Sequence, residues 1–481
     1  MPTVSRVVAN TYRDSVALMQ LALQLRALPG VEEASLVMAT PGNLALLREV
    51  GLLAGEAAAR PSDLLIVVRA KTQAAAEAAV AQAQARLRES PAAGAAGGGA
   101  AEAVAPRSLD MALAAAPESN LALVSVPGEY AAAEAEKALA RALNVMLFSD
   151  NVAVEDEVRL KRLASERGLL VMGPDCGTAI IDGVPLAFAN VVRRGPIGCV
   201  AASGTGLQQV TTLVDRLGLG VSQAIGTGGR DLSEAVGGLT MLAGLARLAD
   251  DRDTKVIVLV SKPPAPAVAE KVIAAAARVR KPVVVNFIGA AAAPRGKNLH
   301  FARTLEDAAR AAVALARGRK PPKAVPLPRL AKTRRKVCGL FSGGTFCYEA
   351  ELLLGAGGHE LVDLGADRYT RGRPHPMIDH RLRNERIVAA AGDPSVAVIL
   401  LDVVLGHGAH PDPAAEMASA LRAARKRRRG VAIVASVCGT DADPQGRARQ
   451  EAALRAEGVH LAPSNAAAAR MALRLAGAAR R

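Results

Sequence analysis

The hydrophobic positions of the chain fall into short runs that alternate with longer amphipathic stretches. Apolar runs of about four to eight residues, such as Val31–Met38, are typical of buried strands, whereas the longer stretches repeat apolar residues at helical spacing. Strands that alternate with helices predict parallel sheets covered by helices. This alternation continues to the last predicted helix, Ala466–Leu475. We therefore expect an α/β protein.

The first 90 residues form a unit of their own in this pattern. A Gly/Ala-rich segment, residues 91–106, follows it and is expected to be a linker because such residues cannot bury enough surface to fold. We expect residues 1–90 to form an α/β sandwich with a role in oligomerisation or regulation. Its predicted strands are Val4–Ala9, Val31–Met38 and Asp63–Arg69, and its predicted helices are Asp14–Leu28, Gly42–Leu53 and Thr72–Arg88.

The stretch Gly195–Gly206, GPIGCVAASGTG, predicts a strand that breaks into a helix. The strand covers Ile197–Ala202, the turn is Ser203-Gly204-Thr205-Gly206, and the helix follows over Leu207–Leu217. The first N–H groups of a helix lack partners inside it and carry the positive end of its dipole. The turn is therefore a candidate phosphate site. The alternative is that its Gly and Ser residues serve only a tight turn.

The same stretch recurs 139 residues further along the chain. A constant offset across strand, turn, helix and next strand indicates duplication of a whole domain. We expect one repeat domain at 195–319 and a second at 333–481, joined by a Pro/Lys-rich linker at 320–332. The second phosphate-binding turn is then Ser342-Gly343-Gly344-Thr345. The matched pairs are Cys199 and Cys338, Ser203 and Ser342, Gly204 and Gly343, Gly218 and Gly357, and Gly226 and Gly365.

Residues 107–194 predict a further parallel sheet, which ends in Gly173-Pro174-Asp175-Cys176. Ligands of such sheets bind beyond the carboxyl ends of the strands. The four residues of this stretch are therefore candidates for cofactor binding. Three glycines of the first repeat domain also follow a predicted strand and join them as candidates: Gly226, Gly228 and Gly229.

These motifs resemble those of a known enzyme family. GPDCGTAII followed by GPIGCVAASGTGLQQVTTLVDRLGLGVSQAIGTGG resembles the α subunit of succinyl-CoA synthetase, and CGLFSGGTFCYEAELLL with LVDLGA is similar to the carboxyl-terminal domain of its β subunit. The whole layout resembles the FdrA family of acyl-CoA synthetase-like proteins. The resemblance covers about 120–318 and 336–478. It implies a CoA-binding Rossmann-like domain at 107–194 and two flavodoxin-like domains of the succinyl-CoA synthetase type.

The resemblance implies that the two Ser-Gly turns face each other and hold one phosphoryl group. The family carries that group on a histidine inside a Gly-His-Ala-Gly loop, and here His300 lies near the expected place but outside this motif. The family's glutamate turn is replaced by Ser261–Pro264. An ATP-grasp domain is missing as well, so a partner subunit would have to bring ADP or ATP with Mg²⁺.

Two further groups of residues are candidates for chemistry. His407, His410 and Asp412 follow a predicted strand, and can serve as acid and base or hold a metal, although His and Asp are also common turn residues. Arg373 and Arg381 lie in the preceding basic loop, where they can clamp a substrate carboxylate or remain solvated. No metal ligand is assigned.

Composition argues against a protein that binds single-stranded nucleic acid. The net charge is +15, yet there is no Trp and aromatic residues make up 2% of the chain, so the stacking platforms of a single-strand binder are missing. The run Arg425–Arg429 ends a predicted helix and is either a solvated helix end or a contact for an anionic ligand, an acidic partner or nucleic acid. Five scattered Cys fit a reducing compartment. We expect a cytoplasmic protein without a signal peptide, a membrane span or bound nucleic acid.

Three functions remain open at this point. The first is an acyl-CoA synthetase-like protein that binds acyl phosphate and CoA, as a subunit of a hetero-oligomer or as a homodimer. The second is a subunit of a carbamoyltransferase of the oxamate type, which uses carbamoyl phosphate in purine and allantoin nitrogen catabolism, as the resemblance implies for relatives. The third is a non-catalytic sensor of CoA or acyl phosphate, which would leave His407 and His410 without a role.

Overall fold

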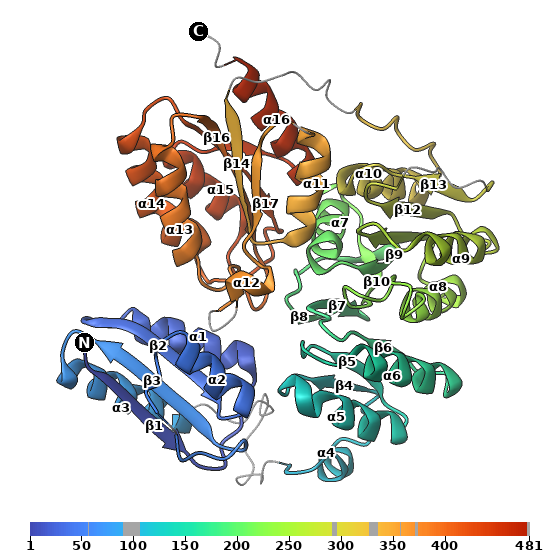
Figure 1. Cartoon of the computed structure of the whole chain (residues 1–481). Helices are drawn as coiled ribbons and strands as arrows, with labels where there is room; N and C mark the ends of the chain where they lie inside the picture. The colour runs from blue at the N-terminus through green and yellow to red at the C-terminus, as the bar shows by residue number, and fades with distance from the viewer. Residues whose placement is uncertain are drawn as a thin grey trace. The chain divides into compact units, whose positions relative to one another are not determined.

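The computed structural model describes residues 1–55, 57–89, 106–290, 296–326, 335–355, 357–370 and 374–478. The chain divides into two compact units, which are described separately below (Figure 1). The first is Met1–Asn144 with the short segment Arg371–Pro374, and the second is Val145–Thr370 with His375–Arg481. None of the helices in the described ranges has the length and apolarity that a bilayer crossing needs.

The first unit begins with a three-stranded antiparallel sheet of order β1-β3-β2. Its central strand, LLIVVRA, buries both of its faces: Ile66 and Val68 pack with one cluster, and Leu65 and Val67 pack with a second one that contains Leu47 of α2. The sandwich expected for residues 1–90 is therefore confirmed. Its elements are β1 (Thr3–Val8), α1 (Ser15–Arg26), β2 (Val31–Met38), α2 (Pro41–Glu49), β3 (Leu64–Ala70) and α3 (Gln73–Glu89).

Among the described residues of the remainder of the first unit are two helices and one strand. The predicted linker at 91–106 lies outside the described residues except for its last position. Ser108 caps the short helix that follows, since its side chain accepts the N–H of Met111. The elements are α4 (Leu109–Ala115), β4 (Leu121–Val124) and α5 (Gly128–Ala140).

The second unit opens with two parallel strands and a helix between them, and continues into a β-hairpin. The hairpin joins the next sheet, because β7 pairs antiparallel with β10. The predicted Gly173–Cys176 stretch thus lies between the parallel pair and the hairpin. These elements are β5 (Asn144–Leu147), α6 (Val154–Glu166), β6 (Val171–Met172), β7 (Thr178–Ile181) and β8 (Val184–Ala187).

The first repeat domain contains a seven-stranded sheet of order β13-β12-β11-β9-β10-β7-β8. Strands β9 to β13 are parallel, so their carboxyl ends share one edge of the sheet. The elements are β9 (Arg194–Ala202), α7 (Gly204–Arg216), β10 (Val221–Gly226), α8 (Leu239–Asp250), β11 (Val256–Ser261), α9 (Pro266–Ala277), β12 (Val283–Phe287), β13 (Leu299–Phe301) and α10 (Leu305–Ala316).

The second repeat domain has a five-stranded parallel sheet of order β15-β14-β16-β17-β18. This order matches that of β10-β9-β11-β12-β13, strand for strand, as duplication predicts. The elements are β14 (Lys336–Phe341), α11 (Gly344–Leu354), β15 (Glu360–Asp363), α12 (Asp367–Thr370), α13 (Arg381–Gly392), β16 (Val396–Val404), α14 (Pro413–Arg427), β17 (Ala432–Cys438), α15 (Arg447–Ala456), β18 (His460–Ala462) and α16 (Asn465–Ala478).

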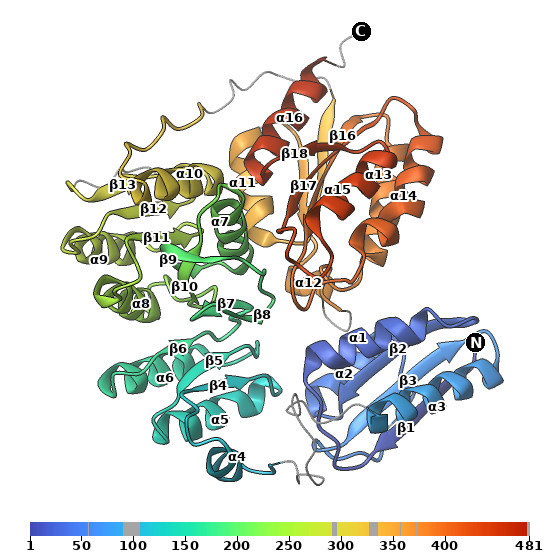
Figure 2. The same ribbon diagram turned by 180° about the vertical axis from the view of Figure 1, so that it is seen from behind.

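One hydrophobic core joins the two repeat domains. Helices α7 and α10 of the first domain and α11 and α16 of the second lie between the two sheets, as both views show (Figures 1 and 2). Most of the side chains that α10 and α16 contribute are alanines, for example Ala308, Ala312 and Ala472, so these helices can approach closely. Because α7 and α11 directly follow the two Ser-Gly turns, this packing decides where the turns lie.

Polar contacts fix the same interface at its ends. Asn190 donates to the carbonyl of Leu405 at 2.9 Å and to Asp443 Oδ2 at 2.8 Å, and the N–H of Val191 donates to Asp443 Oδ1 at 2.7 Å. On α11, Glu349 accepts the N–H of Leu305 at 2.8 Å and Asn465 Nδ2 at 2.9 Å. A buried carboxylate therefore ties α11 to α10 and α16.

Glu349 makes the stability of this interface depend on pH. Burial raises its pKa from 4.5 to about 7. The folded state therefore keeps a proton that the unfolded state has lost, and this contribution to stability falls as pH rises from about 4.5 to 7. We expect Glu349→Gln to remove a pH-dependent loss of up to about 3 kcal/mol. Urea unfolding at pH 5 and pH 8 measures it, and an equal pH slope in both proteins would refute the assignment.

Candidate functional site

The two Ser-Gly turns touch each other. Ser203 Oγ and Thr345 Oγ1 are 2.6 Å apart, and both side chains are buried. Gly343 packs on Thr205 so closely that a Cβ at position 343 would lie 2.8 Å from Thr205 Cγ2. The structure thus brings together residues that are separated by 142 positions in the chain.

Each turn starts a helix, and the helix ends supply N–H groups. Ser203 is the N-cap of α7, and its Oγ accepts the N–H of Gly206 at 2.9 Å. The N–H groups of Gly204 and Thr205 have no hydrogen-bond partner within the helix, because no helical carbonyl precedes them. The same holds for Gly344 and Thr345 at the start of α11. Four N–H groups and two positive dipole ends are therefore available for an anion.

A buried ion pair holds the second turn. Asp402 of β16 accepts the N–H of Ser342 at 2.8 Å and that of Gly343 at 2.8 Å. Arg383 donates to Asp402 Oδ1 at 3.0 Å and to Ser342 Oγ at 2.7 Å, and both charged side chains are 1% exposed. The pair therefore consumes the first two N–H groups of this turn and leaves those of Gly344 and Thr345 for a ligand.

A lysine from the first repeat domain reaches the second turn. Lys262 directly follows β11, and its Nζ lies 3.3 Å from the position that a Cβ on Gly344 would take. Asp363 Oδ2 lies 2.4 Å from the same point. Burial raises the pKa of Asp363, whereas the N–H of Gly365 and the Lys262 ammonium lower it. A cation and an acid thus stand together at the start of α11.

His375 is the histidine next to the second turn. Its Nδ1 accepts the N–H of Met377 at 3.2 Å, so Nε2 carries the proton of the neutral ring. Nε2 lies 2.9 Å from the position of a Cβ on Gly365, a point that is also 2.8 Å from the Ser342 carbonyl oxygen. Burial lowers the pKa of His375 to about 4. The ring is therefore a neutral hydrogen-bond donor at physiological pH.

The predicted cofactor stretches contact each other. A Cβ on Gly228 would lie 2.2 Å from the Pro174 carbonyl oxygen, and one on Gly226 would lie 2.6 Å from Cys176 Sγ. Cys176 is buried, which raises its pKa to about 12 and makes it a poor nucleophile. Asp175 is exposed, yet the protein displaces enough of its water to raise its pKa to about 6, with the carboxylates of Asp150 and Asp367 nearby. Gly229 lies beside Asp175: a Cβ on Gly229 would lie 3.9 Å from Asp175 Oδ2.

The structure does not bring His300 to the turns. It lies on the edge strand β13, and two strands, β12 and β11, separate it from β9. Three strand spacings amount to about 14 Å. Burial lowers the pKa of His300. A phosphate bound at Ser203 would therefore be out of its reach in this conformation.

The other predicted chemical residues take part in local contacts. Asp412 caps α14, and Gln450 and Arg449 bind its carboxylate at 2.9 and 3.2 Å. The Nδ1 of His410 accepts the N–H of Asp412, and its ring lies 5.3 Å from that of His380 at a tilt of 33°. His407 is exposed, and its backbone N–H donates to the Ala189 carbonyl. None of the three forms a hydrogen bond with either turn, and all lie in described segments.

Of the two arginines predicted to bind a substrate carboxylate, only Arg381 lies in the described residues. Arg381 binds Asp379, with Nη2 3.0 Å from Oδ2. Arg373 lies outside the described residues. Lys262, Asp363 and His375 were not selected from the sequence as ligands of the turns. Lys262 and Asp363 stand where predicted strands end, which is the signal that could have found them, but His375 carries no such signal.

Three family models match parts of the chain. The CoA-ligase model matches residues 340–475, and the CoA binding domain model matches residues 193–289. The latter covers the first repeat domain and not 107–194, so CoA binding by 107–194 stays a prediction. A third model, "AllF, heavy metal-associated domain", matches residues 1–105.

A relative of the whole chain decides the family. The uncharacterized protein YahF of Escherichia coli is 42% identical over 495 residues, which covers 95% of each chain. The chain belongs to the YahF family. The α subunit 2 of the ADP-forming succinate–CoA ligase of Archaeoglobus fulgidus is 28% identical over 38% of this chain and 64% of its own length. This YahF relative is thus related to the succinate–CoA ligase superfamily.

Among solved structures, the chain is similar to the dinucleotide-forming acetyl-coenzyme A synthetase 1 of Ca. Korarchaeum cryptofilum in complex with phosphate and ADP. That likeness covers 75% of this chain and 83% of the synthetase chain, with 17% identity and a TM-score of 0.34. A likeness at this level supports no inference about the YahF-type chain.

The contact between the turns can be tested by a double-mutant cycle. Gly343→Ala places a Cβ 2.8 Å from Thr205 Cγ2, and we expect overpacking to cost about 1–3 kcal/mol of unfolding free energy. Thr205→Ser removes this methyl group and should recover about 0.5 kcal/mol or more of that loss. Urea unfolding measures both variants, with Thr211→Ser further along α7 as the control. Strictly additive effects of Gly343→Ala and Thr205→Ser would show that the turns are apart.

Proposed function

We propose that this chain binds the phosphate group of an acyl phosphate between the starts of α7 and α11, and works as a subunit of an acyl-CoA synthetase-like complex. The observation that carries the proposal is the meeting of two helix N-termini with Lys262 beside them. Helix N-termini, N–H groups and a lysine are the groups that proteins use for phosphate. The relationship to the succinate–CoA ligase superfamily and the two CoA-related domain matches support the same chemistry.

In this proposal the protein stabilises the leaving phosphate. A nucleophile, such as the thiol of CoA, gives up its proton and attacks the carbonyl carbon, the bond from that carbon to the phosphate oxygen breaks, and the phosphate departs with the electron pair. The N–H groups of Gly204, Thr205, Gly344 and Thr345 and the Lys262 ammonium face the charge that develops. Asp363 can take the proton of the nucleophile, and the His375 N–H can polarise the carbonyl oxygen. CoA or an acyl phosphate is thus the ligand, and a partner subunit brings ATP or ADP with Mg²⁺.

A carbamoyltransferase subunit is the second candidate. It is favoured by the distance between His300 and the turns, because transfer from carbamoyl phosphate needs no phosphohistidine. The five cysteines are buried, and burial raises the pKa of Cys199, Cys338, Cys347 and Cys438 to about 12, as for Cys176. A covalent intermediate on a cysteine thiolate of this chain is therefore also disfavoured. In this reading the nitrogen of an amide acceptor attacks the carbamoyl carbon and phosphate leaves.

Calorimetric titration of Lys262→Gln with acetyl phosphate tests the phosphate site. Loss of one ammonium at the start of α11 should raise the Kd about tenfold or more, which corresponds to about 1.4 kcal/mol. The control is Lys255→Gln at the opposite, amino-terminal end of β11, which should change the Kd less than about twofold.

The same titrations separate the candidates. Binding of CoA together with acetyl phosphate supports the synthetase, whereas binding of carbamoyl phosphate without CoA supports the transferase. A wild-type chain that binds none of acetyl phosphate, carbamoyl phosphate and inorganic phosphate would overturn both.

A further inference from the structure

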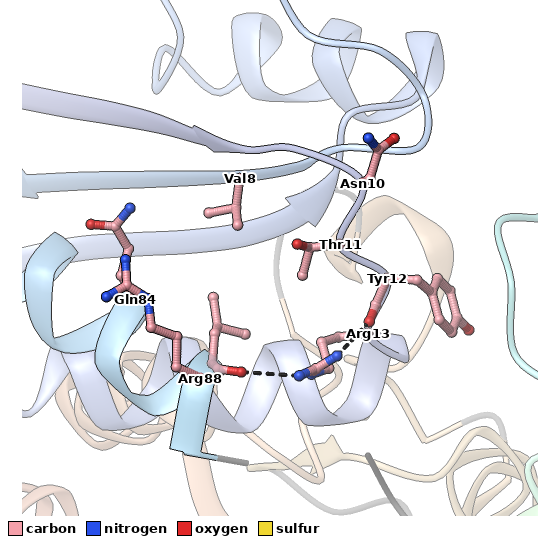
Figure 3. Close-up of a pocket in the computed structure, with 8 residues that line it drawn as sticks. Val8, Asn10, Thr11, Tyr12, Arg13, Gln84 and Arg88 are labelled. Atoms are coloured by element: carbon pink, nitrogen blue, oxygen red, sulfur yellow. Dashed lines mark hydrogen bonds between the residues drawn. The ribbon is translucent and has the colours of Figure 1, made fainter. Parts of the chain in front are cut away.

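A pocket of about 240 Å³ lies in the N-terminal domain, far along the chain from the turns (Figure 3). It opens between the loop that connects β1 to α1 and the last turns of α3. Val8 and Leu87 contribute its apolar lining. Its polar lining is made of Asn10, Thr11, Tyr12, Arg13, Gln84 and Arg88.

The lining carries two guanidinium groups and no carboxylate. The nearest acids of the loop are already engaged. Asp14 caps α1 by accepting the N–H of Ala17 at 3.0 Å, and Asp63 accepts the N–H of Asn10 at 2.9 Å and that of Arg60 at 2.8 Å. The lining itself therefore carries positive charge and no negative charge.

Arg13 is held in place before any ligand binds. Its Nη1 donates to the Tyr12 carbonyl at 2.9 Å, and its Nη2 donates to the Leu87 carbonyl at 3.0 Å (Figure 3). A guanidinium has five N–H donors, so three remain for a ligand. Arg88 is exposed, and its side chain forms no hydrogen bond or ion pair with the described residues. One arginine is thus fixed in position, and the other is free to close on a bound group.

The side chains do not suit the heavy metal that the matched family model names. Residues 1–105 contain no Cys and no His, and these supply the thiolate and imidazole ligands that soft and transition metals prefer. Two arginines at the pocket would repel a cation. The residues present here are therefore unsuited to a heavy-metal ion.

We propose that this pocket binds a small oxyanion, a carboxylate or a phosphate, between Arg13 and Arg88. The planar fork of arginine matches both groups in a bidentate manner. Asn10, Thr11 and Gln84 add hydrogen-bonding groups that can select the remainder of the ligand. The N-terminal domain is then a ligand-binding domain, independent of what the paired turns bind.

Hydrogen–deuterium exchange of the full chain tests this site, because peptides report on each region separately. The probes are succinate, inorganic phosphate and Zn²⁺, each titrated alone. We expect succinate or phosphate to slow exchange in peptides that cover residues 8–20 and 80–88, and the better of the two identifies the class of oxyanion. Arg88→Gln should raise the half-saturating concentration about tenfold, and Arg13→Lys should also weaken binding.

The control is Arg86→Gln on the same helix, because Arg86 binds Gln24 and does not line the pocket. It should leave the half-saturating concentration within about twofold. Three results would overturn the proposal: protection of these peptides by Zn²⁺, protection by neither oxyanion, or equal protection in the wild type and in Arg88→Gln. If an oxyanion protects only peptides around Ser203 and Ser342, the pocket peptides are not protected, and the proposal is overturned.

Discussion

Two helix N-termini that face each other repel, and the second unit holds two such ends in contact. Each end carries about half a positive charge. The ends of α7 and α11 are nevertheless in contact, since Ser203 Oγ and Thr345 Oγ1 share a hydrogen bond of 2.6 Å. Asp402 and Asp363 supply negative charge on the α11 side, where Arg383 pairs with Asp402 and Lys262 stands beside Asp363. The arrangement therefore favours an additional anion, which is the physical basis of the proposed phosphate site.

The packing of the repeat domains holds the two ends together against this repulsion. Apolar side chains from α7, α10, α11 and α16 form one core between the sheets, and those of α10 and α16 are mostly alanines. The buried pair Arg383 and Asp402 fixes the second turn through Ser342. Removing one partner of such a pair leaves an uncompensated buried charge, which costs about 3–5 kcal/mol. The geometry of the site thus rests on groups that do not touch the ligand themselves.

Much of the fold could be predicted from the sequence. The offset of 139 residues indicated a duplication, and the two sheets do share one strand order. Apolar runs placed β1, β2, β3 and β9 within a few residues, but α4 and the β7–β8 hairpin were missed. These two elements are short, and a short apolar run carries little periodic signal.

The site was harder to predict. The Ser-Gly turns could be found because each is a local strand-to-helix motif. Lys262, Asp363 and His375 reach the second turn only through the fold, since they come from the end of β11, the end of β15 and the segment before α13. Residue type alone was a poor guide for Asp412, whose carboxylate serves as a helix cap. Distances between strand ends are set by sheet order, and the sequence does not state that order.

The most direct measurement is anomalous diffraction from crystals of the full chain grown with tungstate, a heavy analogue of phosphate. The account predicts a tungsten peak bounded by the N–H groups of Gly204, Thr205, Gly344 and Thr345, with Lys262 Nζ in contact. Tungsten sites elsewhere with none between the starts of α7 and α11, in crystals where these two helix ends are free of lattice contacts, would contradict it.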